Sequence, residues 1–490
     1  MHPEVTRTPA AGGAATPPHV VVVGAGIAGL AAARALLAQL PGARVTVLEA
    51  GPRTGGKLRL GEMAGQPVDL GAEAILNRRP EAVDLAREVG LGDSLVYPLT
   101  TSAGVWTRGA VRRLPRTVMG VPADLGALGD SGIVGRRAVP RARLERAMRR
   151  LDVTEDVGIG RLVARRMGGE LRDRLVEPML GGVYAGRADD LSLHAAVPQL
   201  VPAIAEHGSL TAAASVVAAN SPSAEPVGQA TATPVFAGID GGVARLASAT
   251  EAAVRAAGGE VRCRVTVREI SRTRIGFRLV AGPTIAPEKV DADAVVLATP
   301  AVASARLLRS VAPRAAADLA GVDYASMALV TLALEASSVS GDLHGSGFLV
   351  PPVDGRDVKA VTFSTSKWGW HSPELVLARC SIGRYGDEQQ LQHDDTELVA
   401  SAVMDLREAV GLRGRLVDTT VTRWGGALPQ YAVGHVDRVR RIREAVADVP
   451  GLAVCGAAYD GLGLPACIAS GTEAATRVAE RLRGRETMVP

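Results

Sequence analysis

The stretch VVVVGAGIAGLAAARAL, residues 20–36, decides the fold. A short apolar run leads into a glycine-rich turn, and an alanine-rich helix is expected to follow to about Gln39. In the pattern G-x-G-x-x-G, Gly24 allows a tight turn, Gly26 lets the backbone approach a pyrophosphate, and Gly29 lets the helix pack on the strand. The helix N-terminus then faces the phosphates.

A second expected strand, residues 43–51, completes a βαβ unit and hence a parallel sheet. Glu49 lies 20 residues after Gly29, at the end of this strand. A carboxylate in this place accepts both hydroxyls of a ribose, and it would repel the 2′-phosphate of NADP. The sequence therefore predicts a dinucleotide site for either NAD or FAD.

Composition limits the class of protein. The chain has 490 residues and 47% of them are apolar, which indicates a globular protein of two or three domains. No long uncharged apolar run is present, so we expect no spanning helix, and residues 1–17 are expected to form a disordered tail without the order of a secretory signal. Four scattered cysteines favour a reducing cytoplasm and give no metal-site spacing. A net charge of +4 with 3% aromatic residues argues against nucleic-acid binding.

The nucleotide-binding domain is expected to be discontinuous, built from residues 18–98, 206–300 and 426–490. Within it, 241–270 should form a helix and then a strand, and 208–234 should be a mobile loop from about residue 219.

Two further segments lie between these pieces. The arginine-rich segment 99–205, with helical stretches at 140–151 and 159–180, predicts a helical insertion. Alternating stretches in 301–425 predict an antiparallel-sheet, substrate-binding domain. The expected fold class is therefore mixed α/β (α+β): a Rossmann-type domain with a parallel sheet, an antiparallel-sheet domain and a helical insertion.

The run EAGPRTGGK, residues 49–57, distinguishes an FAD site from an NAD site. Arg53 can reach a pyrophosphate, and Gly55 and Gly56 let the chain pass close to the flavin side of a dinucleotide. The run resembles the glycine-pair motif of the amine oxidase, phytoene desaturase and protoporphyrinogen oxidase superfamily, which NAD dehydrogenases lack. The resemblance implies non-covalently bound FAD.

Further motifs narrow the resemblance. The run VCGAAYDGLGLPACIASGTEAA, residues 454–475, is similar to the flavin-covering segment of protoporphyrinogen and coproporphyrinogen oxidases. Other motifs of these enzymes follow in the right order, at residues 69–91, 175–198, 347–351, 367–370 and 423–439. Over about residues 18–485 the chain is identified as a member of the HemY-type porphyrinogen oxidases.

The resemblance implies the following site residues. The FAD contacts are Gly24, Ala25, Gly26, Ile27, Ala28, Gly29, Leu30, Glu49, Ala50, Arg53, Gly55, Gly56, Lys57, Gly71, Ala72, Glu73, Ala74, Val267, Trp424, Ala457, Leu462, Gly463 and Leu464. Val267 would meet the adenine by its backbone, and Trp424 would line the isoalloxazine. Arg78 and Arg79 would bind substrate propionates. No catalytic side chain and no metal are expected, because flavin N5 carries the chemistry.

The implied activity is the oxygen-dependent oxidation of coproporphyrinogen III to coproporphyrin III in haem biosynthesis. Six electrons leave the porphyrinogen through its meso carbons and pyrrole N–H groups, and three O₂ become three H₂O₂. Protoporphyrinogen IX is the alternative substrate. Protoporphyrinogen-type members tend to carry a propionate-binding arginine where this chain aligns Ala103, which favours coproporphyrinogen.

A flavin amine oxidase, a carotenoid desaturase and a flavin-bearing scaffold without turnover are the competing classes. Only Tyr431 and Tyr459 are available to frame an amine, and no cysteine stands in the usual flavin-attachment run. The arginine-rich insertion argues against a desaturase. We expect a cytoplasmic protein, and we leave open a weak peripheral membrane contact and a downstream haem-pathway partner.

Overall fold

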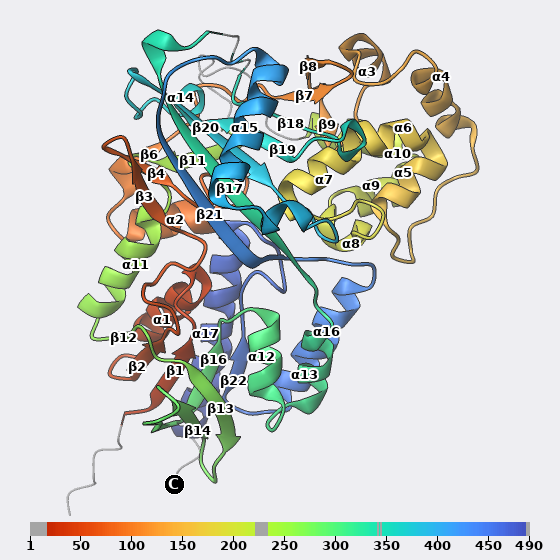
Figure 1. Cartoon of the computed structure of the whole chain (residues 1–490). Helices are drawn as coiled ribbons and strands as arrows, with labels where there is room; N and C mark the ends of the chain where they lie inside the picture. Colours follow the sequence, from red (N-terminus) through yellow and green to blue (C-terminus); the bar gives the residue numbers. More distant parts are fainter. Residues whose placement is uncertain (1–16, 221–233, 341–342, 344, 487–490) are drawn as a thin grey trace, which may run out of the picture.

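The computed structural model describes residues 17–220, 234–340, 343 and 345–486. Figure 1 shows a lower half built on a parallel sheet and an upper half in which a larger sheet lies beside a group of helices. The tail expected at 1–17 and the loop expected from about 219 to 234 lie almost wholly outside the described residues.

The lower half contains a five-stranded parallel sheet. Its strands, in spatial order, are β12 (Glu260–Arg262), β2 (Arg44–Leu48), β1 (His19–Val23), β16 (Ala294–Leu297) and β22 (Leu452–Val454). Because side chains alternate along a strand, Val20 and Val22 of β1 enter one core cluster and Val21 and Val23 enter another. The sheet is therefore covered on both faces, as its continuous valine run predicts.

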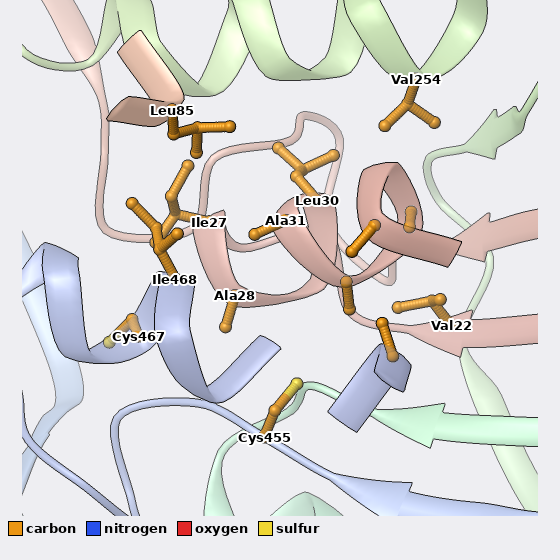
Figure 2. Close-up of a cluster of buried hydrophobic side chains, with 14 of the residues drawn as sticks. Val22, Ile27, Ala28, Leu30, Ala31, Leu85, Val254, Cys455, Cys467 and Ile468 are labelled. Atoms are coloured by element: carbon orange, nitrogen blue, oxygen red, sulfur yellow. The ribbon is translucent and has the colours of Figure 1, made fainter. Parts of the chain in front are cut away.

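Helices cover the first face of this sheet. They are α1 (Ile27–Gln39), α2 (Glu81–Glu88), α11 (Arg245–Ala256) and α17 (Leu464–Glu486). Figure 2 shows Ile468 of α17 directed toward Ile27 of α1 and Leu85 of α2. Gly471 permits the close approach of α17 to α1, since a Cβ there would lie 2.1 Å from the Ala28 carbonyl oxygen.

The second face carries a small antiparallel sheet and three helices. They are β13 (Val267–Arg272), β14 (Phe277–Ala281), β15 (Glu288–Ala292), α12 (Ala301–Leu308), α13 (Pro313–Ala320) and α16 (His435–Ala447). The stretch 241–270 thus ends in two strands of different sheets, where the sequence predicts a single one. Arg264 lies in the connection between them with φ of 59°, a left-handed conformation that turns the chain out of the parallel sheet.

The upper half is organised by a seven-stranded sheet. In spatial order its strands are β21 (Leu416–Pro429), β17 (Tyr324–Glu335), β20 (Leu375–Ile382), β19 (Val358–Phe363), β18 (Gly347–Leu349), β7 (Gly104–Thr107) and β8 (Ala110–Arg113). Neighbours are antiparallel except β18 and β7, which are parallel. The mixed fold class, with one parallel and one largely antiparallel sheet, is confirmed.

The segment 99–205 is not helical throughout, contrary to its sequence pattern. Its first part supplies β7 and β8, a hairpin that turns at Arg108 and Gly109 with φ of 54° and 77°. The expected helix 159–180 is interrupted after Met167 by Gly168, at φ of 107°, and the helical turns of 140–151 end at Ala147.

Helices make up most of the remainder of this segment. They are α3 (Leu125–Ser131), α4 (Ala138–Arg143), α5 (Ile159–Met167), α6 (Gly169–Leu171), α7 (Glu177–Tyr184), α8 (Leu193–Ala196) and α9 (Leu200–His207), which ends two residues beyond the segment. Helix α10 (Leu210–Ala219) follows the segment and packs in the same core cluster. A further helix, α15 (Asp395–Val410), packs on the seven-stranded sheet, and α14 (Ser364–Lys367) follows β19.

Three small sheets complete the described chain: β3 (Leu60–Met63) with β4 (Gln66–Asp69), β9 (Thr117–Val118) with β10 (Val121–Pro122), and β11 (Phe236–Ile239) between β5 (Ile75–Leu76) and β6 (Leu95–Val96). Among the helices of the described residues, we find none with the length and apolar character needed to span a bilayer.

Candidate active site

The carboxyl ends of the parallel strands meet at a cavity of about 600 Å³. The cavity is lined by Val23 at the end of β1 and Gly24 after it, by Glu49 after β2, by Ala298 after β16 and by Gly456 after β22. This is the edge at which open parallel sheets bind their ligands.

The three glycines of the first turn occupy sterically different places. Gly24 has φ of 101°, a conformation that L side chains rarely adopt. A Cβ on Gly29 would lie 2.0 Å from the Gly24 carbonyl oxygen, so only glycine lets α1 begin this close to β1. A Cβ on Gly26 would meet no heavy atom within 4 Å, and Gly26 lines the cavity.

Glu49 is fixed in orientation by backbone N–H groups. The Ala25 N–H donates to its Oε2 at 2.8 Å, and the Gly51 N–H donates to its Oε1 at 2.7 Å. The carboxylate therefore links the glycine turn after β1 to the chain after β2, with acceptor capacity left for a ligand in the cavity.

The glycine-pair loop packs directly against the first turn. The Gly55 N–H donates to the Ala25 carbonyl at 2.8 Å, and both Gly55 and Gly56 have positive φ. Arg53 is directed onto this loop, where its guanidinium donates to the carbonyls of Thr54, Gly56 and Leu58. Arg53 thus holds the loop and does not line the cavity.

At its other end the cavity becomes apolar and reaches the upper half. Gly182 and Val183 of α7, Met327 and Leu329 of β17, and Leu462 form this part. The Tyr431 hydroxyl donates to the Ala457 carbonyl at 2.6 Å and fixes the turn after β22. A ligand bound across the strand ends would therefore be overlaid by the seven-stranded sheet.

One wall of the cavity is held by buried polar groups. The Trp424 indole N–H donates to the Leu70 carbonyl at 2.9 Å. Asp69 accepts the N–H groups of Val243 and Ala244, and burial raises its pKa to about 6. Gly71, Ala72 and Trp424 line the cavity.

Glu73 lies behind this wall. Its carboxylate is 2.7 Å from Arg379 and 3.7 Å from Lys367. Burial favours its neutral form, but the two cations and the Ser364 hydroxyl outweigh burial and hold the pKa of Glu73 at about 2.

The cavity brings together most residues that the sequence predicts. These are Gly24, Gly26, Ile27, Ala28, Glu49, Ala50, Gly55, Gly56, Lys57, Gly71, Ala72, Val267, Trp424, Ala457, Leu462 and Leu464. The cavity lining does not include Ala25, Gly29, Leu30, Arg53, Glu73, Ala74, Gly463, Arg78 and Arg79. Arg79 instead pairs with Glu81 at the start of α2, with a shortest N–O distance of 2.5 Å.

Sequence reasoning missed the lining contributed by β16 and α12. Ala298, Thr299, Pro300, Ala303 and Arg306 all face the cavity. The signal was present, because the run DAVVLATP marks a parallel strand whose carboxyl end must lie at the ligand edge.

Two cations on the cavity lining are not neutralised by a carboxylate within the described residues. Lys57 is largely buried, which lowers the pKa of its ammonium group. Arg306 lies on α12, and no acidic side chain in the described chain is within ion-pair distance of either group. A diphosphate dianion would supply the missing negative charge.

Replacing Arg306 by Ala is expected to weaken FAD binding by about 10-fold, the effect of one exposed charge-assisted contact of about 1.4 kcal/mol. The dissociation constant is measured by flavin fluorescence quenching on the apoprotein. Arg309→Ala is the matched control, since Arg309 is exposed at the end of the same helix and does not line the cavity. Equal losses in the two variants would contradict a local role.

Together these features define a dinucleotide-binding oxidoreductase. One cavity is lined by a glycine turn, a carboxylate fixed beside that turn, two cations without a carboxylate partner among the described residues, and apolar side chains of the upper half. This set of groups fits FAD, which offers ribose hydroxyls to a carboxylate, a diphosphate to cations and a large ring system to apolar side chains.

Comparisons with known proteins agree with this class. Residues 27–479 match the family of flavin-containing amine oxidoreductases. The coproporphyrinogen III oxidase of Mycobacterium tuberculosis is 36% identical over 473 residues, covering 95% of this chain and 98% of that protein. The coproporphyrinogen III oxidase of Bacillus subtilis is 29% identical over 466 residues, with coverage of 93% and 97%. A solved structure from Exiguobacterium sp. 255-15 has a TM-score of 0.81 at 29% identity and covers 95% of this chain and 99% of its own.

The chain therefore belongs to the flavin-containing amine oxidoreductase family, and within it to the porphyrinogen oxidases that its motifs resemble. It is an oxidoreductase, and its cofactor is FAD.

Proposed function

We propose that this protein oxidises coproporphyrinogen III to coproporphyrin III in haem biosynthesis, with three O₂ reduced to three H₂O₂. The observation that carries the proposal is the apolar end of the cavity, which lies between the cofactor edge of the parallel sheet and the upper half. A flat, apolar macrocycle suits such a chamber. The names of the relatives from M. tuberculosis and B. subtilis support the choice of substrate.

Bound FAD would supply the hydride acceptor and the route of electrons to O₂. The chain's own residues bind and orient. Glu49 would accept the ribose hydroxyls, and Lys57 and Arg306 would neutralise the diphosphate. Met327, Leu329 and Val183 would exclude water from the reacting carbon. We assign no side chain as acid or base.

The proposal is tested by initial rates on coproporphyrinogen III and protoporphyrinogen IX, followed by porphyrin fluorescence. Coproporphyrinogen III should react at least 10-fold faster at equal low concentration, because its two additional propionates each offer a charge-assisted contact. Under anaerobic conditions the porphyrinogen should bleach the flavin. A preference for protoporphyrinogen IX would assign the alternative substrate, and the absence of bleaching would reject the oxidase.

The arginines at 78 and 79 differ in their availability for a propionate. Arg79 is engaged by Glu81, whereas Arg78 is exposed and forms no ion pair within the described residues. We therefore expect Arg78→Ala to raise KM for coproporphyrinogen III about 10-fold, with a smaller change for protoporphyrinogen IX. Arg79→Ala is the matched control and should change KM less. An unchanged KM in both variants would show that neither Arg78 nor Arg79 binds the substrate.

We extend the proposal to a cytoplasmic protein with weak peripheral contact to an anionic membrane. Arg143, Arg146 and Arg149 are exposed around α4 together with Leu144 and Met148, a basic and partly apolar surface suited to lipid headgroups. Co-sedimentation with vesicles of phosphatidylglycerol, compared with phosphatidylcholine, tests this contact. A downstream enzyme that takes the porphyrin product is part of the same proposal.

A further inference from the structure

Arg379 occupies an unusual place for a guanidinium group. It lies within β20, between Thr331 of β17 and Thr362 of β19, and its side chain is 6% exposed. Taking such a charge out of water is costly unless it is paired and hydrogen-bonded. Its contacts should therefore explain why it is there.

Its side-chain contacts lie on residues 71–73, the segment that forms the cavity wall and continues behind it. One guanidinium nitrogen of Arg379 is 2.7 Å from the Glu73 carboxylate, and another donates to the Gly71 carbonyl at 2.6 Å. Neither Arg379 nor Glu73 lines the cavity, but Gly71 does. Arg379 therefore does not touch a cofactor bound in the cavity, but it holds the backbone of a residue that lines it.

The wall has little room to move. A Cβ on Gly71 would lie 2.0 Å from the Lys57 carbonyl oxygen and 3.3 Å from the Trp424 ring. The Ala72 N–H donates to that same carbonyl at 3.2 Å. Any shift of Gly71 would thus be passed to Lys57 and Trp424, which both line the cavity.

We propose that Arg379 is a positioning residue: by its bond to the Gly71 carbonyl it sets the place of the Gly71–Ala72 wall against the flavin and fixes that wall to the seven-stranded sheet. Glu73 compensates the buried charge and orients the guanidinium, while the Gly71 contact transmits the effect. This inference rests on the proposed flavin chemistry. Misplacement of reacting groups by about 1 Å costs roughly 10²-fold in rate. Loss of the Gly71 contact should therefore lower kcat.

Arg379→Lys tests the contact, because a single ammonium group does not reproduce the fork that reaches carboxylate and carbonyl together. With FAD saturating, we expect an altered visible circular dichroism of the oxidised flavin. We also expect kcat on coproporphyrinogen III to fall 10- to 100-fold, with KM changed less than threefold. Wild-type dichroism and kcat in this variant would overturn the proposal.

Two matched controls separate the carbonyl contact from the charge. Lys367→Met removes the other cation of Glu73 without touching Gly71 and should leave the flavin dichroism unchanged. Ser364→Ala removes the neutral hydroxyl that also bonds Glu73, leaves the bond from Arg379 to Gly71 in place and should likewise stay near wild type. If either control shifted the dichroism as much as Arg379→Lys, the surroundings of Glu73 and not the carbonyl contact would be responsible, and the proposal would fail.

A fourth variant tests the proposal if Arg379→Lys folds poorly. The double change Arg379→Met/Glu73→Gln leaves no uncompensated buried charge, so it is expected to fold, and it lacks the Gly71 contact. It should show the altered dichroism, and a wild-type spectrum would overturn the proposal. Because the spectrum is recorded without porphyrinogen, a wrong substrate assignment would leave it intact and appear only in kcat.

Discussion

Replacing Gly26 by Ala is expected to weaken FAD binding at least 100-fold without lowering the stability of the apoprotein. A Cβ at this position meets no heavy atom within 4 Å, and the φ of −66° suits any residue. The added methyl group would instead enter the cavity that Gly26 lines, where the backbone must approach a diphosphate closely. A 100-fold loss corresponds to about 2.7 kcal/mol of binding free energy.

The measurement pairs FAD titration of the apoprotein with its thermal unfolding. Gly29→Ala is the matched control, because its Cβ would lie 2.0 Å from the Gly24 carbonyl oxygen and 3.0 Å from the Ala298 Cβ. That variant should lose stability as well as FAD. If Gly26→Ala unfolded at as low a temperature as Gly29→Ala, the space beside Gly26 would not be a ligand site.

Local sequence patterns were sufficient to predict the cofactor edge of the fold. The valine run, the glycine turn and Glu49 are set by contacts within about thirty residues, and parallel topology brings the ends of β1 and β2 together. The C-terminal run 454–475 was predictable for the same reason. Strand β22 pairs in parallel with β16, so its carboxyl end lies at the same edge of the sheet. The mixed fold class is therefore encoded in local sequence patterns.

The parts that escaped prediction depend on contacts distant in sequence. Arg379 meets Gly71 across 308 residues, and no local pattern indicates that pairing. The position of Glu73 in its motif predicts a cofactor contact. Its ion pair with Arg379 instead directs the carboxylate away from the cavity. The hairpin of β7 and β8 belongs to the larger sheet only because β7 pairs with β18, far along the chain.

Lys359 provides the second large expected effect. Its side chain lies in β19, is 2% exposed and donates to the Gly383 carbonyl at 2.6 Å. Burial, with a smaller contribution from the positive charge of Arg384, lowers the pKa of Lys359 to about 7. No carboxylate lies within ion-pair distance of it in the described chain. The folded protein therefore holds this amine neutral above pH 7, whereas the unfolded chain keeps it protonated up to its ordinary pKa of about 10.4.

The sign of the pH dependence follows from proton binding. Between about pH 7 and 10 the unfolded state binds one more proton than the folded state, so the free energy of unfolding rises with pH. Over that window the lysine contributes about 4 kcal/mol. Below pH 7 both states are protonated, and the folded protein carries the full cost of the buried charge.

Lys359→Met should remove this slope, because methionine fills a similar volume without a titrating group. The unpaired Gly383 carbonyl would cost about 1 kcal/mol, which leaves the variant more stable than wild type at pH 7. Urea unfolding at pH 7, 8, 9 and 10 gives the difference curve, in which other titrating groups cancel. Lys289→Met is the matched control, since Lys289 is exposed on β15 and should give a curve parallel to that of wild type. A Lys359→Met curve that also ran parallel would mean that the buried amine is charged in the folded protein, and hence that a counter-charge or water reaches it.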